Sequence, residues 1–358
     1  MKKRVFFVTF AGDEGGPQAW FKQVASHPRF RDDVDAHIWM PSGNFKGPMG
    51  KLRLFRACRS EYAQAGRIKV VYVSLDLDFG VQIALMLRIL GAKTIIMHSH
   101  VARFTDQEGF KFRMYRKLAA AIADRKVAVS EDSARGMFGC GLERAKLLPA
   151  FVDFKVLWDA SNGCSEEAVR SLTAEVEKKF VFACIGRMAR NKNMELAIDA
   201  FALYRENNRS AGSKLLLVGT GPREESLKLK CAELGIEGDV IFYGWVDNVE
   251  VYLRYAVDCL LMPSLLEGAP RVAMEAQAFG CSVIVSEAVP EFCLFREDLA
   301  TRLNELDAEI WAREMERVAR GGKKTIGNGI EIARQHPLFS IDQGIEDFLD
   351  LLEPSETR

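Results

Sequence analysis

Two glutamates in the segment EGAPRVAMEAQAFG (267–280) have residue types and spacing that could bind a ligand rich in phosphate and hydroxyl groups. Glu267 stands directly before Gly-Ala-Pro, and Glu275 lies eight positions later. Pro270 suits the first position of a helix, because its φ is fixed and it has no N–H to lose. The spacing therefore predicts a helix that starts near residue 270, with Glu275 about 7 Å along its axis.

The start of this helix is a candidate phosphate site, because a helix N-terminus presents free N–H groups and the positive end of its dipole. The distance between the glutamates is about the reach of a diphosphate. The pattern thus fits a nucleoside diphosphate that carries a further group, with ribose hydroxyls near Glu275 and a hydroxyl-rich group near Glu267. A surface helix with two solvated glutamates is the alternative interpretation.

Three further turns follow strand-like runs. IGRMARNKN (185–193) contains Arg187 and Lys192. The planar fork of the arginine side chain and the point charge of the lysine side chain both suit phosphate oxygens. Solvated surface charge explains many such pairs and is the alternative interpretation. AGDEGGPQAW (11–20) contains Gly15 and Gly16, which allow close approach of backbone to a ligand or form a plain tight turn. VGTGPRE (218–224) lacks the third glycine of the dinucleotide fingerprint, so we interpret it as structural and not as an NAD site.

These turns must be positioned by parallel sheets, because continuous apolar strands interleaved with helices are typical of sheets covered on both faces. The expected strands are 4–10, 36–40, 69–75, 93–97 and 126–130, then 180–186, 214–219, 239–244, 257–263 and 282–286. The break between the two series predicts an α/β chain with two doubly wound domains, 1–155 and 156–335, and a ligand site in the cleft between them. A final helical segment is expected in 336–358.

Composition excludes several classes of protein. With 358 residues, 48% apolar and 27% charged, the chain is long enough for two soluble globular domains. No apolar run is long enough to span a membrane, and VFFVTF is too short for a signal peptide, so we expect a cytoplasmic protein. The eight cysteines form no C-x-x-C pair and are interpreted as core residues of a reducing compartment.

Charge is unevenly distributed, although the net charge is zero. Residues 1–155 hold 26 Lys and Arg against 15 Asp and Glu, and the rest of the chain carries the opposite excess. A basic first half indicates an anionic partner, either a phosphate-bearing molecule or a membrane surface, and no nucleic acid is expected.

Taken together, the ordered segments GRMARNKN, VGTGP, IFYGWV and MPSLLEGAPRVAMEAQAFGCSVIVSE resemble the nucleotide-binding domain of family 4 retaining glycosyltransferases with the GT-B fold. The resemblance covers residues 180–292, and the E-x7-E element is its most specific part. The EGAP form and VPE (289–291) are similar to the branch that builds capsule, exopolysaccharide and O-antigen chains. MHSH (97–100) and LLPAFVD (147–153) resemble the segments that lead from the acceptor domain to the hinge. The last helix, in 336–358, resembles the one that crosses back to the first domain. Pro270 and Arg271 depart from the family pattern, which commonly has glycine and an aliphatic residue there.

The resemblance implies roles for individual residues. Arg187 and Lys192 would grip the donor diphosphate and stabilise the leaving group, and Glu267 would lie near the donor sugar hydroxyls. Glu275 would bind the nucleotide ribose, and His98, with His100 as a competitor, would lie at the mouth of the acceptor cleft. The remaining positions are a donor-binding set, Gly268, Ala269, Pro270, Tyr243, Gly244 and Trp245, and the turn near the phosphates and acceptor, Gly15 and Gly16.

The resemblance also implies an activity. We expect transfer of a sugar from a nucleoside-diphosphate sugar, with a UDP-sugar favoured, to a glycan or lipid-diphosphate-linked acceptor with retention of anomeric configuration. No cofactor and no metal are expected, and LDLDFG (75–80) is interpreted as a strand end. A GT-B-like nucleotide-sugar epimerase and a non-catalytic nucleotide-sugar-binding scaffold protein are the alternatives.

Two stretches of the basic half, KLRLFRACR (51–59) and FKFRMYRK (110–117), mix Arg and Lys with Phe, Leu, Met and Tyr. Such stretches can lie on anionic lipid with their apolar side chains down. They favour the hypothesis of a peripheral protein on the inner membrane face, and a solvated basic face that binds acceptor phosphates or nothing is the alternative.

Overall fold

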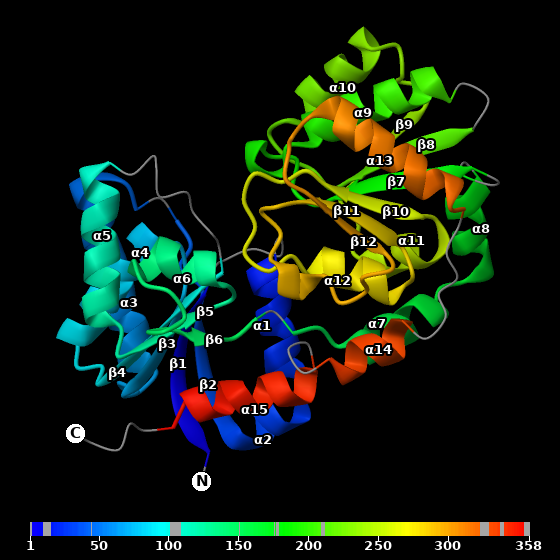
Figure 1. Cartoon of the computed structure of the whole chain (residues 1–358). Coiled ribbons are helices and arrows are strands. Elements are labelled where there is room, and N and C mark those ends of the chain that lie inside the picture. The colour runs from blue at the N-terminus through cyan, green and yellow to red at the C-terminus, as the bar shows by residue number, and fades with distance from the viewer. Residues whose placement is uncertain are drawn as a thin grey trace. The chain divides into compact units, whose positions relative to one another are not determined.

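The computed structural model describes residues 2–9, 16–43, 45–100, 109–149, 151–174, 176, 179–208, 212–322, 329–336 and 340–353. The chain divides into two compact units. Unit 1 comprises Met1–Phe151 and Ile341–Arg358, and unit 2 comprises Val152–Ser340. Each unit is built on its own parallel six-stranded sheet (Figure 1).

The sheet of unit 1 has the order β2-β1-β3-β4-β5-β6, and every pairing in it is parallel. The chain moves from β1 to β2 on one side and then continues on the other side of β1, so its topological switch point lies between β1 and β3. The strands are β1 (Lys3–Thr9), β2 (Val34–Trp39), β3 (Val70–Ser74), β4 (Thr94–Ser99), β5 (Arg125–Ala128) and β6 (Lys146–Leu147).

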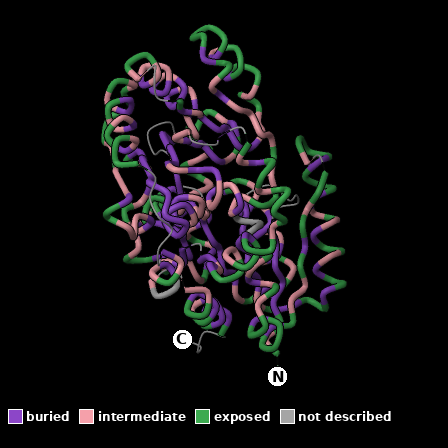
Figure 2. Tube along the Cα trace, turned by 90° about the vertical axis from the view of Figure 1, so that its right-hand side faces the viewer, coloured by how far each residue is buried: buried purple, intermediate pink, exposed green. Residues whose placement is uncertain are grey.

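Helices cover both faces of this sheet because its strands are apolar on both sides. One core cluster joins the sheet to α3 (Gly47–Gln64), α4 (Leu77–Ile89), α5 (Phe110–Ile122) and α6 (Glu131–Phe138). A second cluster joins the opposite face to α1 (Gly16–Ser26), α2 (Pro28–Asp33) and α15 (Ile341–Leu351). Figure 2 shows buried residues along the strands and exposed residues on the outer sides of the helices.

The helix α15 packs into unit 1 although it follows the whole of unit 2 in the sequence. Phe348 is fully buried and contacts the rings of Phe7, Trp20 and Tyr72. Gly344 lies against Phe151, and a Cβ added at Gly344 would be 2.1 Å from Phe151 Cδ1. Only a glycine therefore allows this close approach without a shift of the ring or the helix.

The sheet of unit 2 has the order β12-β11-β10-β7-β8-β9, again with parallel pairings throughout. The strands run outward from β7 to β9 and then continue on the other side of β7, so the switch point lies between β7 and β10. The strands are β7 (Phe180–Ile185), β8 (Ser213–Val218), β9 (Val240–Gly244), β10 (Cys259–Met262), β11 (Ser282–Ser286) and β12 (Ala300–Leu303).

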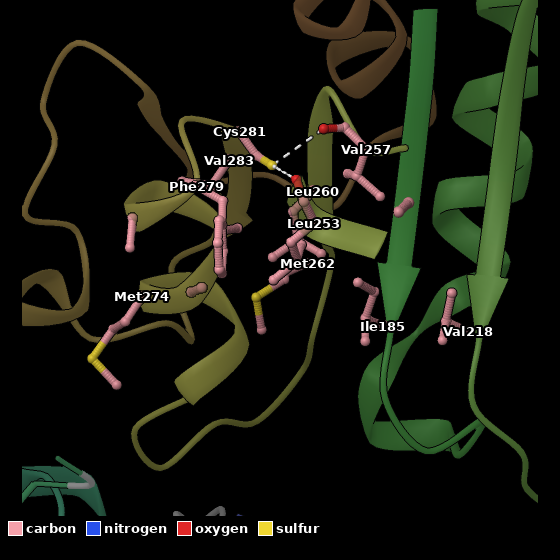
Figure 3. Close-up of a cluster of buried hydrophobic side chains, with 14 of the residues drawn as sticks. Ile185, Val218, Leu253, Val257, Leu260, Met262, Met274, Phe279, Cys281 and Val283 are labelled. Carbon is pink, nitrogen blue, oxygen red and sulfur yellow. Dashed lines mark hydrogen bonds between the residues drawn. The ribbon is translucent and has the colours of Figure 1, made fainter. Parts of the chain in front are cut away.

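One face of this sheet packs against α9 (Met194–Asn207), α10 (Glu224–Glu233) and α13 (Ala308–Arg320). The other face packs against α7 (Phe154–Asn162), α8 (Glu166–Ala174), α11 (Val249–Tyr255), α12 (Arg271–Ala278) and α14 (Gly329–Gln335). Figure 3 shows this second core, in which Met274 and Phe279 lie near Leu260, Met262 and Val283. Cys281 Sγ also lies 3.1 Å from the Leu253 carbonyl and 3.2 Å from the Val257 carbonyl, which links α12 to α11.

The fold class expected from the sequence is confirmed: both units are doubly wound α/β structures, and the ten expected strands are present with ends shifted by up to two residues. The short strands β6 and β12 were not expected. LDLDFG is not a strand end, because β3 stops at Ser74 and α4 starts at Leu77. All eight cysteines are free, as expected. Among the residues that the structure describes, no helix is both long and apolar enough to cross a bilayer.

Candidate functional site in unit 2

The candidate site lies at the carboxyl edge of the unit 2 sheet. In an open parallel sheet, ligands bind beyond the carboxyl ends of the strands at the switch point. Here the switch point separates β7 from β10. The chain leaves β7 into the turn that contains Lys192, and it leaves β10 into the loop that contains Glu267. Topology alone therefore brings together two residues that are 75 positions apart.

Lys192, which is partly buried, and Glu267, which is buried, form a charged pair at this point. Lys192 Nζ donates a 2.7 Å hydrogen bond to Glu267 Oε1, and Ser264 Oγ donates a second bond of 2.7 Å to the same oxygen. The carboxylate side chain is 8% exposed and the lysine side chain is 23% exposed. Ser286 at the end of β11 donates its hydroxyl to the Ser264 carbonyl at 2.6 Å, so three neighbouring loops fix the position of the carboxylate.

Backbone contacts hold the surrounding loops close together. Leu265 N donates to the Asn191 carbonyl at 2.8 Å, which ties the β10 loop to the β7 loop. On the other side, Gly219 has a φ of +127°, and a Cβ there would be 2.1 Å from the Gly186 carbonyl oxygen. A Cβ at Gly221 would be 2.4 Å from the Met188 carbonyl oxygen. The glycines of VGTGP thus have a packing role, because they let the β8 turn lie against the β7 turn.

Arg187 begins the same β7 turn, and its side chain is exposed. Gly268 and Pro270 are buried and Ala269 is half-buried in the loop that leads to α12. Pro270 has extended backbone, with φ −72° and ψ 108°, and α12 starts at Arg271, one residue later than the sequence predicted. No side chain caps this helix start, so its first N–H groups are not satisfied by an N-cap side chain.

Glu275 lies one turn into α12 and forms an ion pair with Arg271, whose nearest nitrogen is 3.3 Å from its carboxylate. Both side chains are 12% exposed. Glu250, in the first turn of α11, also faces this region: partial burial and then the negative charge of Glu275 raise the pKa of its carboxyl. Two carboxylates from neighbouring helices therefore interact near one guanidinium.

The three residues predicted to lie near a nucleobase stand at the end of β9. Tyr243 contacts the ring of Tyr252, and Gly244 has a φ of +66° at an irregularity in the β8–β9 pairing. Gly244 accepts a 2.6 Å hydrogen bond from Gly219 N through its carbonyl. Trp245 is 47% exposed, and its Nε1 donates to Asp247 at 3.1 Å. An exposed indole beside the glycine turns is available for stacking.

A second group of polar side chains lies at the carboxyl edge of unit 1. This imidazole cluster consists of Trp20, Tyr72, His98 and His100. The His98 and His100 ring centroids are 3.9 Å apart, and Trp20 contacts both rings. His98 is fully buried, and its Nδ1 hydrogen-bonds the Tyr72 hydroxyl.

Both imidazoles of this cluster are neutral over the physiological pH range. Burial, and then the charge of His100, lower the pKa of His98 well below its usual value. Burial lowers the pKa of His100 to about 3. Within the part of the chain that the structure describes, Thr9 Oγ1, Trp20 Nε1 and His100 Nε2 are buried without a hydrogen-bond partner. Gly15 lies outside the described residues, and Gly16 is the first residue of α1.

Unit 2 thus gathers Lys192 with Glu267 and Glu275 with Arg271, and unit 1 gathers His98 with His100. Ser264, Ser286 and Glu250 were missed by the sequence reasoning. Ser264 stands three positions before Glu267 in the same loop, which is a weak signal, and no local pattern singles out the other two. In the described ranges no three His, Cys, Asp or Glu side chains form a group that could hold a metal ion.

Comparison with known proteins bears on the family and on the fold of the chain. Residues 165–303 match the family model of glycosyl transferases group 1. EpsF of Bacillus subtilis (strain 168), which carries the name of a glycosyltransferase, is 28% identical over 286 residues, or 77% of this chain and 73% of EpsF. An Escherichia coli UDP-Gal:alpha-D-GlcNAc-diphosphoundecaprenol alpha-1,3-galactosyltransferase is 26% identical over 54% of this chain and about half, 52%, of its own length.

Among solved structures, Anabaena HepE in complex with UDP and glucose superimposes with a TM-score of 0.77. The alignment covers 98% of this chain and 99% of HepE at 18% sequence identity. That likeness extends over both units, and GT-B enzymes recur among the structural neighbours. By fold the chain is therefore GT-B, and residues 165–303 match the group 1 glycosyl transferase model.

Proposed function

We propose that the protein is a retaining glycosyltransferase that moves a sugar from a nucleoside-diphosphate sugar, with a UDP-sugar favoured, to a glycan or lipid-diphosphate-linked acceptor of a cell-surface polysaccharide. The observation that carries this proposal is the Lys192–Glu267 pair at the switch point of unit 2, directly before the uncapped start of α12. The names of EpsF and of the galactosyltransferase support the reaction class, and the UDP and glucose of HepE support the donor class.

In the proposed reaction, bond cleavage leaves negative charge on the departing diphosphate. Lys192, Arg187 and the first N–H groups of α12 stabilise that charge without reorganisation, which is where electrostatic catalysis is most effective. No metal is required for this step, because these groups supply the positive charge.

Glu267 accepts hydrogen bonds from Lys192 and Ser264 at Oε1, so Oε2 carries neither of these bonds. A carboxylate held in this way suits binding of donor sugar hydroxyls better than attack on carbon. We therefore assign retention to attack of an acceptor hydroxyl on the same face that the diphosphate leaves, with the hydroxyl proton passing to the departing diphosphate as the sugar–phosphate bond breaks. Glu275 binds the ribose, and the nucleobase lies near Tyr243, Gly244 and Trp245.

The test is a thermal-shift panel of UDP, GDP, ADP and CMP, each with and without Mg²⁺. A ligand at a hundred times its dissociation constant stabilises the fold by about 2.7 kcal/mol, which raises Tm by a few degrees. We expect UDP to stand out without metal. If no diphosphate shifts Tm, the donor site is absent and a scaffold role becomes the better interpretation. Turnover of a UDP-sugar to another UDP-sugar without acceptor would instead indicate an epimerase.

The acceptor of such an enzyme resides on a membrane when it is lipid-linked, and unit 1 carries a surface that suits anionic lipid. The helices α3 and α5 lie on either side of α4 on one face of the sheet (Figure 1). Their exposed side chains include large apolar residues, namely Met49 (68% exposed), Leu52 (41%), Phe110 (76%) and Met114 (40%). Exposed cations accompany them: Lys51, Arg56, Arg59, Lys111, Arg113 and Lys117.

Flotation with anionic and with zwitterionic vesicles tests this part of the proposal. We expect the protein to float with anionic vesicles at moderate salt, and the double variant Phe110→Ala, Met114→Ala to float less. The double variant Leu229→Ala, Leu234→Ala is the matched control, because it removes two exposed apolar side chains from the α10 region of unit 2. A wild-type protein that stays at the bottom with both vesicle types contradicts peripheral membrane binding.

A further inference from the structure

Arg271 is a buried cation whose hydrogen-bonding capacity is only partly used. It is the first residue of α12. Its side chain is 12% exposed. Among the described residues, Nε and Nη1 are buried and have no hydrogen-bond partner, and the ion pair with Glu275 uses Nη2 alone.

Burial of these unpaired N–H groups costs folding free energy unless another group supplies hydrogen-bond acceptors. A guanidinium carries five N–H donors in a planar fork that matches phosphate or carboxylate oxygens. Burying donors of a charged group without partners forfeits their interaction with water. The Lys192–Glu267 pair shows the contrast, because its 2.7 Å bond is as short as a charge-assisted hydrogen bond should be, whereas the Arg271–Glu275 contact is 3.3 Å.

The position of Arg271 indicates which oxygens could satisfy it. Residues four apart on a helix lie one above the other, about 6 Å along the axis. The guanidinium of Arg271 therefore reaches from the helix start to Glu275. Under the proposed function, the helix start receives the diphosphate and Glu275 receives the ribose. The phosphate attached directly to the ribose falls between them.

We propose that Arg271 is a further donor-binding residue, which donates an Nη1 hydrogen to the ribose-linked phosphate while Nη2 holds Glu275 toward the ribose. This inference rests on the proposed function and adds a contact to it. It distinguishes Arg271 from Arg187, whose side chain is exposed in the β7 turn. It also explains why a cation is buried next to a carboxylate that has another function.

The test compares the binding of UDP, UMP and uridine by calorimetry in wild type, Arg271→Leu and Arg271→Lys. Loss of a charge-assisted phosphate contact should weaken UDP and UMP by about tenfold, whereas uridine, which has no phosphate, should change far less. The lysine variant should retain part of the affinity for UMP, because it keeps the charge and loses the fork.

Arg205→Leu is the matched control, because Arg205 is also a partly buried arginine in an ion pair, with Asp239 at 2.7 Å, at the amino end of β9. It should lower Tm and leave the ratio of UMP to uridine affinity unchanged. Equal weakening of all three ligands in Arg271→Leu would overturn the phosphate contact and leave Arg271 as a positioning residue for Glu275. Unchanged UDP affinity in that variant would overturn the inference alone. A wild-type protein that binds no UDP would overturn the proposed function, and the inference with it.

Discussion

The carboxyl edges of the two sheets differ in electrostatic character, although both sheets are parallel and doubly wound. At the switch point of unit 2, the charges of Lys192 and Glu267 satisfy each other and are supported by Ser264. At the corresponding edge of unit 1, His98 and His100 are neutral, because burial lowers the pKa of both imidazoles.

This difference suggests different roles for the two edges. A charged pair that is already in place can stabilise the charge of a departing diphosphate without reorganisation. A neutral, buried edge offers dipoles and ring faces, which suit hydroxyl groups or simple packing and give little stabilisation to an anion. The comparison is consistent with donor chemistry in unit 2 and acceptor binding in unit 1, as the proposed function requires.

The largest expected effect comes from breaking the charged pair. Lys192→Ala should lower the rate of sugar transfer by about 10²–10³-fold, because it removes a cation that stabilises the leaving group and leaves Glu267 buried without its partner. The rate is measured as release of UDP from the donor in the presence of acceptor. Circular dichroism should show the same fold as in wild type.

Lys214→Ala is the control for this prediction. Lys214 Nζ pairs with Asp239 Oδ1 at 3.0 Å at the amino ends of β8 and β9, so it resembles Lys192 in chemistry but lies at the opposite edge of the sheet. Lys214→Ala should reduce Tm and retain transfer. Normal transfer by Lys192→Ala would remove the assignment of the site to this edge.

Much of the fold could be predicted from the sequence because apolar runs of strand length are a local signal. SVIVS (282–286) became β11 with the expected ends. The strands β6 and β12 were missed because KL and ATRL are short and partly polar, and pairing with a neighbouring strand stabilises them more than their own composition does.

The candidate site was predictable only where spacing determines geometry. The two-residue spacing of His98 in β4 and His100 just beyond its end places both rings on the same side of the chain, and the spacing of Arg271 and Glu275 places both on one face of α12. The contacts of Ser264 with Glu267 and of Ser286 with the Ser264 carbonyl depend on how loops from neighbouring strands meet. The proximity of Glu250 to Glu275 depends on the packing of two helices, which no local pattern encodes.

A smaller effect should appear in acid, and it concerns unit 1. The imidazoles of His98 and His100 have lower pKa values in the folded protein than the usual 6.5 or so of an unfolded chain. Below that pH the unfolded state therefore binds more protons than the folded state, so the free energy of unfolding decreases as the pH falls. For His100 this decrease continues down to a pH of about 3. Above the unfolded pKa the full contribution of both imidazoles to stability is present. Each imidazole should contribute a slope of about 1.4 kcal/mol per pH unit in this window.

Urea unfolding between pH 7.5 and pH 4.5 measures this slope. His98→Asn and His100→Asn should each reduce it relative to wild type. Tyr72→Phe is the control, because it removes the hydroxyl that bonds His98 but keeps both imidazoles. It should lower stability at every pH and retain the slope. An unchanged slope in both histidine variants would show that the cluster is hydrated, and the contrast between the two edges would then lose its basis.

The smallest expected effect concerns Glu250, a carboxylate near the unit 2 site that lies close to the like charge of Glu275. Partial burial and the charge of Glu275 raise the pKa of Glu250, so the folded state holds its proton more tightly than the unfolded state does. Stability therefore falls as pH rises from the unfolded value of about 4.3 through the raised folded value. Glu250→Gln should raise Tm by a few degrees at pH 7.5 and change it little at pH 4.

Glu314 on α13 provides the opposite case within the same unit. Burial alone would raise its pKa, but hydrogen bonds from Arg317 and Thr301 outweigh burial and lower it. Glu314→Gln should therefore lower Tm at pH 7.5, where Glu250→Gln raises it, and both effects should fade in acid.

If Glu275→Gln is introduced first, the gain in Tm from Glu250→Gln should shrink, because part of the repulsion between the two carboxylates is already gone. A gain that stays the same size would mean that burial alone raises the pKa of Glu250, and that α11 and α12 are not coupled electrostatically at the candidate ribose site.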